Sequence, residues 1–147
     1  MAATLDGTAV LVVDDDPDNL EMLGYTLSAE GATVRTARNA REALELLPDW
    51  KPDVLLLDIE MPVTDGYELL SAIRSRAGLR NVPAVAVTAL GYPSDKDRAF
   101  EAGFDAHMTK PFDSAALVKL VESLVAPSSR RSTNPGRAAV SLSRSEA

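Results

Sequence analysis

Short apolar runs alternate along this chain with stretches in which apolar residues recur every three or four positions. A β-branched apolar run bounded by turn residues is typical of a strand buried on both faces. The runs predict strands at Ala9–Val13, Thr33–Thr36, Asp53–Leu57, Val82–Val87 and Ala106–Met108. The clearest helical stripe follows the last run, with Leu117, Leu120, Val121 and Leu124 at i, i+3, i+4 and i+7.

Capping residues mark where the predicted helices begin. Asp16 precedes Pro17, which is the order of an N-cap followed by proline at the first helical position. Asn39 with Glu42 has the spacing of a capping box. Later helices are expected to begin near Asp65 and Glu68, near Ser94 and Asp97, and at Asp113. Strict alternation of five strands with five helices predicts an α/β fold, with a parallel sheet covered on both faces.

Composition limits the chain to one ordinary globular domain. It has 147 residues, of which 46% are hydrophobic and 25% charged. With no cysteine and a single histidine, disulfides, thiolate metal sites and multi-histidine cages are excluded. The apolar runs are far shorter than a membrane span of about 20 residues, and residues 1–7 lack the basic start of a signal peptide. We therefore expect a cytoplasmic protein without membrane insertion.

The charge is unevenly distributed. The net charge is −7, but residues 127–147 contain four arginines and one glutamate, so residues 1–126 carry −10. An acidic body argues against nucleic-acid binding, because phosphate contacts dominate that affinity. Residues 126–147 are rich in Ser, Pro and Arg, and we expect a flexible basic tail there rather than an output domain.

Polar residues follow the predicted strands at the end where ligands bind in such sheets. In open α/β sheets, that place is the crevice outside the carboxyl ends of the strands. Asp14 and Asp15 follow the first strand, Asp58 the third, Thr88 the fourth and Lys110 the fifth. Three carboxylates, one hydroxyl and one amine should therefore meet at one edge of the sheet.

The three carboxylates suggest a divalent cation. Asp14, Asp15 and Asp58 would crowd like charges together, which costs stability unless a cation offsets them. Oxygen ligands suit Mg²⁺, which takes one or two protein carboxylates and keeps several waters. Asp16 is better explained as the helix cap. The alternative for the acidic run is a solvated loop.

Asp58 is also placed to act as a nucleophile. A carboxylate can take a phosphoryl group and form a mixed anhydride when cations offset the charge on the phosphoryl oxygens. Lys110 supplies a compact positive charge, and Thr88 supplies a hydroxyl donor. Taken singly, Lys110 could be a surface lysine and Thr88 a strand-end threonine. Their occurrence together at successive strand ends favours a site.

The chain resembles the receiver domain of two-component response regulators, in particular the chemotaxis-regulator type. The residues that carry the resemblance are VLVVDDDP at 10–17, LLLDIEMPVTDG at 55–66, AVTA at 86–89 and KPF at 110–112. It covers residues 8–125. The resemblance implies a flavodoxin-like fold, a (βα)5 arrangement with strand order 2-1-3-4-5.

The resemblance also implies residue roles. Asp58 matches the phospho-acceptor. Asp15 matches a direct Mg²⁺ ligand, Asp14 matches the other acid of the metal pair and acts through water, and the backbone carbonyl of Glu60 matches a third protein ligand. Thr88 matches the switch hydroxyl and Lys110 the phosphate-binding lysine. A cis bond between Lys110 and Pro111 is implied as well.

Two positions depart from the family pattern. His107 stands where an aromatic switch residue is usual, and it is either a switch or a half-exposed histidine on a short strand. Glu60 adds a carboxylate two residues after Asp58. That carboxylate could compete for the metal or reposition the attacking water, or Glu60 could be a solvated loop acid whose carbonyl alone matters.

The resemblance implies that a histidine kinase or a histidine phosphotransfer protein is the phosphodonor. A downstream protein would then read the face made by the fourth helix, fifth strand and fifth helix. The chain could be a stand-alone regulator or the receiver part of a hybrid kinase. It would be a signalling domain rather than an enzyme.

Three rival functions can be compared with the sequence. A haloacid-dehalogenase-type phosphatase needs Asp-x-Asp-x-Thr/Val after the first strand, and here Pro17 and Asp18 break that motif. No glycine-rich nucleotide loop follows that strand. A receiver-like binding scaffold that is never phosphorylated is the remaining alternative.

Overall fold

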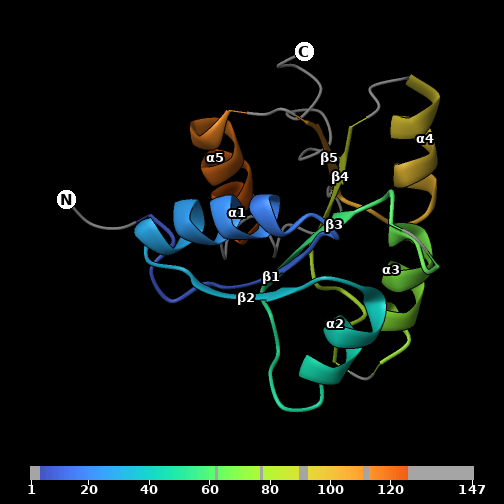
Figure 1. The fold of residues 1–147 in the computed structure, drawn as a ribbon, viewed down its shortest axis with the longest axis horizontal. Helices are drawn as coiled ribbons and strands as arrows, with labels where there is room; N and C mark the ends of the chain where they lie inside the picture. Colours follow the sequence, from blue (N-terminus) through green and yellow to red (C-terminus); the bar gives the residue numbers. More distant parts are fainter. Residues whose placement is uncertain (1–3, 62, 77, 90–92, 111–112, 126–147) are drawn as a thin grey trace.

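Five parallel strands form one sheet in the order β2-β1-β3-β4-β5, which confirms the predicted flavodoxin-like fold (Figure 1). The computed structural model describes residues 4–61, 63–76, 78–89, 93–110 and 113–125, and of residues 93–95 only the backbone. The elements in chain order are β1 Ala9–Val13, α1 Pro17–Ala29, β2 Thr33–Ala37, α2 Ala40–Leu46, β3 Val54–Asp58, α3 Gly66–Arg74, β4 Ala84–Thr88, α4 Pro93–Glu101, β5 Ala106–Thr109 and α5 Ser114–Val125.

The side chains of each central strand alternate between two hydrophobic cores. Leu11 and Leu55 belong to the core that α2, α3 and α4 cover, whereas Val10 and Leu56 belong to the core under α1 and α5 (Figure 1). Every residue of β3 and β4 is buried. Fully burying one such side chain contributes about 1.5–3 kcal/mol, so these strands anchor the fold.

The helix starts predicted at Asp16, Asp65 and Asp113 are confirmed, whereas α4 begins at Pro93 and has Asp97 inside it. Asp16 caps α1 by accepting from the Asp18 N–H, and Asp65 with Glu68 forms a complete capping box at α3. The capping box predicted for Asn39 and Glu42 is wrong in one half. Asn39 accepts from the Glu42 N–H, but the Glu42 carboxylate accepts from the Arg38 N–H and pairs with the Arg38 guanidinium instead of reaching the Asn39 N–H.

Strand ends differ from the prediction by one or two residues. Asp58 and Thr88 are the last residues of β3 and β4 rather than the residues after them, and β4 begins at Ala84 instead of Val82. Within the described ranges, no helix has the length and apolar character to cross a membrane. The predicted basic tail at 126–147 and the predicted cis bond to Pro111 fall outside the described residues.

Candidate functional site

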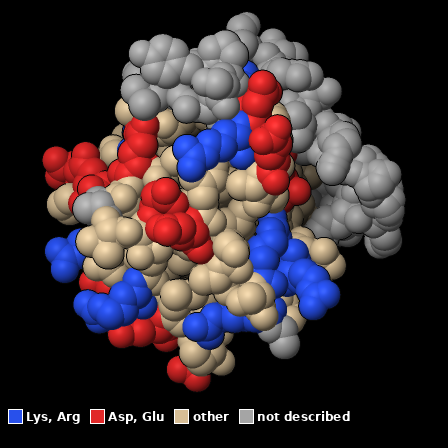
Figure 2. All heavy atoms as spheres, turned by 90° about the vertical axis from the view of Figure 1, so that its right-hand side faces the viewer, with Lys and Arg blue, Asp and Glu red and all other residues tan. Residues whose placement is uncertain are grey.

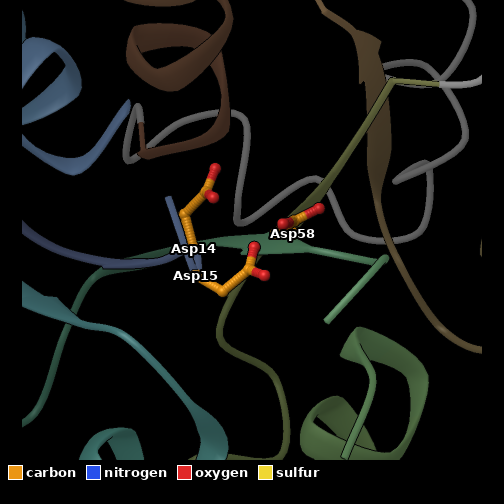
Figure 3. A group of neighbouring side chains, drawn as sticks. All are labelled: Asp14, Asp15 and Asp58. Carbon is orange, nitrogen blue, oxygen red and sulfur yellow. The ribbon is translucent and has the colours of Figure 1, made fainter. Parts of the chain in front are cut away.

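The loop after β1 brings two carboxylates to the carboxyl end of the sheet. Asp14 is buried, its Oδ1 accepts from the Asp16 N–H at 2.9 Å, and its Oδ2 accepts from Asn19 Nδ2 at 3.3 Å. Asp15 is exposed, and its side chain reaches toward Asp58 from the neighbouring strand (Figure 3). The cap at Asp16 holds this loop in place, because it ties the loop to the first turn of α1.

Asp58 ends β3 with a carboxyl that is 3% exposed. Its Oδ1 accepts from the Glu60 N–H at 3.1 Å, and its Oδ2 lies 3.8 Å from Lys110 Nζ. Burial raises the pKa of the Asp58 carboxyl to about 7, and the charge of Asp14 adds to the rise, whereas Lys110 and the Glu60 N–H oppose it. The acceptor position predicted from the sequence therefore holds a carboxyl that is costly to ionise without further positive charge.

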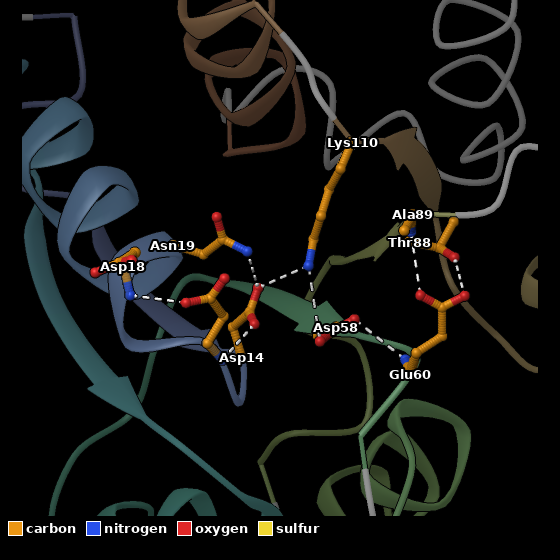
Figure 4. Close-up of polar contacts among 9 residues, drawn as sticks. Asp14, Asp18, Asn19, Asp58, Glu60, Thr88, Ala89 and Lys110 are labelled. Carbon is orange, nitrogen blue, oxygen red and sulfur yellow. Dashed lines mark hydrogen bonds and ion pairs between the residues drawn. The ribbon is translucent and has the colours of Figure 1, made fainter.

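Lys110 lies between the two buried acids. Its Nζ is 3.1 Å from Asp14 Oδ2, and its backbone N–H donates to the Thr88 carbonyl at 2.8 Å (Figure 4). Burial by itself lowers the pKa of Lys110, but the hydrogen bond to Asp14 and the charges of Asp58, Asp14 and Glu60 outweigh it and raise the pKa. Lys110 is therefore a fixed cation at this site.

The three acids fit a small divalent cation. One carboxylate oxygen each from Asp14, Asp15 and Asp58 lies within 4.8 Å of the other two (Figure 3). Among the described residues, Lys110 pairs with Asp14 and Asp58 and Asp15 has no ion pair, so three carboxylates share one cation and the group is short of positive charge. Oxygen-only donors suit Mg²⁺, which does not need a complete protein cage.

Glu60 points away from these acids. Its Oε2 accepts from Thr88 Oγ1 at 2.9 Å, and its Oε1 accepts from the Ala89 N–H at 3.2 Å (Figure 4). Thr88 is 3% exposed, so this contact covers the hydroxyl from one side. The sequence left the direction of the Glu60 side chain open, and the structure places it against the end of β4.

A hollow of about 280 Å³ lies beside this contact. It is lined by Glu60, Thr88, Tyr67, Arg98 and His107, among others. The Arg98 guanidinium lies over the Tyr67 ring, 4.3 Å from its centroid. His107 on β5 is buried, which corrects the half-exposed position that one interpretation of the sequence gave it.

The loop after β3 is tightly constrained. A Cβ at Gly66 would lie 2.6 Å from the Asp58 carbonyl oxygen and 2.9 Å from Ile59 Cα, so only glycine fits there. Val63 in the same loop has a φ of 70° and is fully exposed. A β-branched residue in the left-handed region is strained.

The surface over α3 and α4 carries mixed charge. In the view of Figure 2, Lys and Arg side chains are interspersed with Asp and Glu side chains rather than gathered into one patch. Among the described residues visible in that view, no extended basic strip of the kind that follows a nucleic-acid backbone is present.

Comparison with known proteins identifies the family. The family described as the response regulator receiver domain matches residues 10–122. This chain belongs to the receiver domain family. Its strand order and the acidic group at the carboxyl end of the sheet agree with the resemblance noted in the sequence.

The receiver domain is similar to proteins of different lengths. It is 32% identical over 116 residues to the polar-differentiation response regulator DivK of Brucella anthropi, which covers 78% of this chain and 94% of DivK. It is 40% identical over 116 residues to the transcriptional regulatory protein PrrA of Mycobacterium tuberculosis, covering 79% of this chain and 49% of PrrA. The structure of the chemotaxis protein CheY4 of Vibrio cholerae matches with a TM-score of 0.76 and 31% identity, covering 80% of this chain and 98% of CheY4.

Membership places the chain among signalling domains of two-component systems. Receiver domains interact with histidine kinases or phosphotransfer proteins and generally bind Mg²⁺ at an acidic pocket. The structure brings together Asp14, Asp15, Asp58 and Lys110, as the sequence predicted. Asn19 and the Ala89 N–H also contact the residues of the site, but they could not be found from the sequence because they carry no motif of their own.

Proposed function

We propose that this receiver domain accepts a phosphoryl group on Asp58 and passes the signal on through a conformational change. The observation that carries the proposal is that the Asp58 carboxylate lies beside both the acids Asp14 and Asp15 and the Lys110 ammonium. That arrangement supplies a nucleophile and a cation at one buried point, which phosphoryl transfer requires.

In the proposed transfer, a partner's phosphohistidine docks over the carboxyl ends of the strands. An Asp58 carboxylate oxygen forms a bond to phosphorus as the bond from phosphorus to the imidazole nitrogen breaks, and the nitrogen keeps that electron pair. The Lys110 ammonium approaches the phosphoryl oxygens and the Glu60 N–H steadies the acceptor carboxylate. Hydrolysis of the acyl phosphate returns the domain to its starting state.

A Mg²⁺ ion at this site would be held by oxygen atoms of Asp15, Asp58 and the Glu60 backbone carbonyl, with Asp14 acting through water. When bound, it supplies neutralisation of charge at the phosphoryl oxygens. Support for this part of the proposal comes from the donor set, which is oxygen-only and short of positive charge.

The response to phosphorylation would begin at the end of β4. The Thr88 hydroxyl turns toward the phosphoryl group, and His107 on the neighbouring strand adjusts in the hollow that both residues line. Such a change shifts an equilibrium between two states rather than making a new fold. The face formed by α4, β5 and α5 would present the result to a downstream protein.

The remaining assignments follow from the family. The receiver domain would span residues 8–125, and its phosphodonor would be a histidine kinase or a histidine phosphotransfer protein. We place the exchange in the cytoplasm, where receiver domains typically act. The alternative is a binding scaffold that is never phosphorylated.

Intact-mass spectra after incubation with acetyl phosphate and Mg²⁺ test the proposal. The wild type should gain one base-labile phosphoryl group, and Asp58→Asn should gain none. Lys110→Ala keeps the nucleophile but should be labelled more slowly. Asp16→Asn is the matched control from the same end of the sheet, because asparagine also caps helices, and it should be labelled like the wild type.

Two results would contradict the proposal. Persistent labelling of Asp58→Asn would move the acceptor to another residue. A wild type that stays unlabelled, even with Mg²⁺ and a competent kinase, would favour the scaffold alternative.

A further inference from the structure

The Glu60 carboxylate binds two hydrogen-bond donors at the end of β4. The Thr88 hydroxyl donates to one of its oxygens at 2.9 Å and the Ala89 N–H donates to the other at 3.2 Å. Both oxygens of one anion are therefore satisfied by two adjacent residues (Figure 4). Hydrogen bonds to a charged acceptor are stronger than those between neutral groups.

The same residue is also tied to the proposed acceptor. The Glu60 N–H donates to Asp58 Oδ1 at 3.1 Å, so its backbone cannot move far from Asp58 while its side chain reaches β4. A phosphoryl group on Asp58 would thus form next to a carboxylate that already occupies the Thr88 hydroxyl. The two anions repel each other and need the same donor.

The hollow beside the contact offers another position for the carboxylate. Glu60 and Arg98 line the same space of about 280 Å³, and the Arg98 guanidinium lies over the Tyr67 ring. A Glu60 side chain that leaves Thr88 can therefore turn toward a cation on α4.

We propose that Glu60 is an internal competitor of the phosphoryl group: its carboxylate holds the Thr88 hydroxyl and the Ala89 N–H until phosphorylation of Asp58 displaces it. The inference rests on the proposed function. It makes Glu60 a positioning residue, because its contact with Thr88 sets the free energy that phosphorylation must supply before Thr88 can move. Removing the carboxylate should favour the switched state.

The first test needs no phosphodonor. Amide NMR of the full chain should show the Ala89 N–H resonance shifted by Glu60→Ala and by Glu60→Gln, because both remove the charged acceptor. Glu122→Ala, an exposed acid on α5, is the control and should leave that resonance in place. An Ala89 resonance that is the same in all four proteins overturns the inference.

The second test measures binding of beryllofluoride, a phosphoryl mimic, in the presence of Mg²⁺. Glu60→Ala should bind it about tenfold more tightly than the wild type, which corresponds to about one charge-assisted hydrogen bond. Glu122→Ala should bind like the wild type. An unchanged affinity in Glu60→Ala overturns the inference.

A double-mutant cycle separates competition for Thr88 from general charge repulsion. If Glu60 acts through Thr88, the gain from Glu60→Ala should shrink by at least about half in a Thr88→Ala background, because directly coupled residues are not additive. An equal gain in both backgrounds would mean simple repulsion and overturns the inference. Absence of beryllofluoride binding in every variant, together with no labelling of the wild type, overturns the proposed function and this inference with it.

Discussion

Arg74 and Lys110 are partly buried basic side chains at opposite ends of the sheet, and they are bonded in opposite ways. At the amino ends of β4 and β5, the Arg74 guanidinium donates to the carbonyls of Arg80, Val82 and Gly103 and pairs with Asp105 at 3.4 Å. At the carboxyl ends, Lys110 faces two buried carboxylates and has a third nearby.

The difference separates a polar cluster with balanced charges from a crowded acidic one. Arg74 fastens the end of α3 to two segments with donors and acceptors in balance, which favours a single arrangement. The opposite end has more negative than positive charge, and the pKa of the Asp58 carboxyl rises to about 7 as a result of burial and of Asp14. The side chains at that end are therefore arranged less favourably for stability than they could be, as is often true of sites that bind a ligand or a reacting group.

Removing Arg74 from the amino end of the sheet should have the largest effect on the free energy of unfolding. Arg74→Ala should lower the free energy of unfolding by about 3 kcal/mol, because three carbonyls lose a donor and the Asp105 carboxylate loses its ion pair. Urea unfolding measures this loss. Arg41→Ala removes an exposed pair with Glu45 and should cost about 0.5 kcal/mol or less. Equal losses in the two variants would mean that Arg74 does not anchor this end.

Removing the charge of Asp58 from the acidic cluster with Asp14 and Asp15 should stabilise the protein. The folded-state pKa of Asp58, about 7, lies above its ordinary 3.8, so this group's contribution to stability is lost as pH rises from about 4 to 7. Asp58→Asn should therefore raise the unfolding free energy by about 2 kcal/mol at pH 8 without metal, and by much less near pH 4. Denaturant unfolding at both pH values checks it, with the exposed Asp97→Asn as control. A gain independent of pH would contradict the role of the charge.

Magnesium binding should require Asp15 in the loop after β1 but not Asp16, the next residue. Asp15→Ala should abolish Mg²⁺ binding measured by calorimetry, while the metal-free fold keeps or gains stability because repulsion falls. Asp16→Ala should keep the metal and lose about 1 kcal/mol through the missing helix cap. The metal assignment fails if Asp15→Ala binds Mg²⁺ as tightly as the wild type.

The smallest expected effect concerns backbone strain beside the crowded end. Val63→Gly should raise the unfolding free energy by about 1 kcal/mol, because the valine has a φ of 70° and buries no surface. Gly78→Ala is the converse test. Gly78 has a φ of 86° and open space around it, so an alanine there should lower the unfolding free energy by a similar amount through backbone strain alone. Thermal unfolding would show both changes. A loss of stability in Val63→Gly would mean that this loop is not strained.

Much of the fold could be predicted because local and overall signals agree. The stripe from Leu117 to Leu124 is buried as its spacing predicted, and Asp16 caps α1. The strand ends were predicted less accurately, because the pairing between neighbouring strands continues one residue further than expected, to Asp58 in β3 and Thr88 in β4. Leu5 is fully buried outside any element, and no periodic pattern marks such a residue.

The positions of the candidate site residues were predictable to the extent that topology decides them. Strand order alone brings Asp14, Asp58 and Lys110 to one edge. The direction of the Glu60 side chain was not predictable, because it depends on the path of a loop held by the close contact at Gly66. Nor was the burial of His107, since one polar residue in a four-residue strand gives no pattern.

The contact at Gly66 would limit the direction in which a displacement of Asp58 on phosphorylation could spread. The first turn of α3 rests directly on the backbone of Asp58 and Ile59, with no space for even one methyl group. On that side, β3 has no free space into which it could move. In the proposed switch, a displacement at Asp58 would instead pass across the ladder to β4, and through the hydrogen bond from the Lys110 N–H to the Thr88 carbonyl toward the end of β5. If Asp58 is phosphorylated as proposed, the missing side chain at Gly66 would make α3 the fixed side of the domain and leave β4 and β5 as the parts that move.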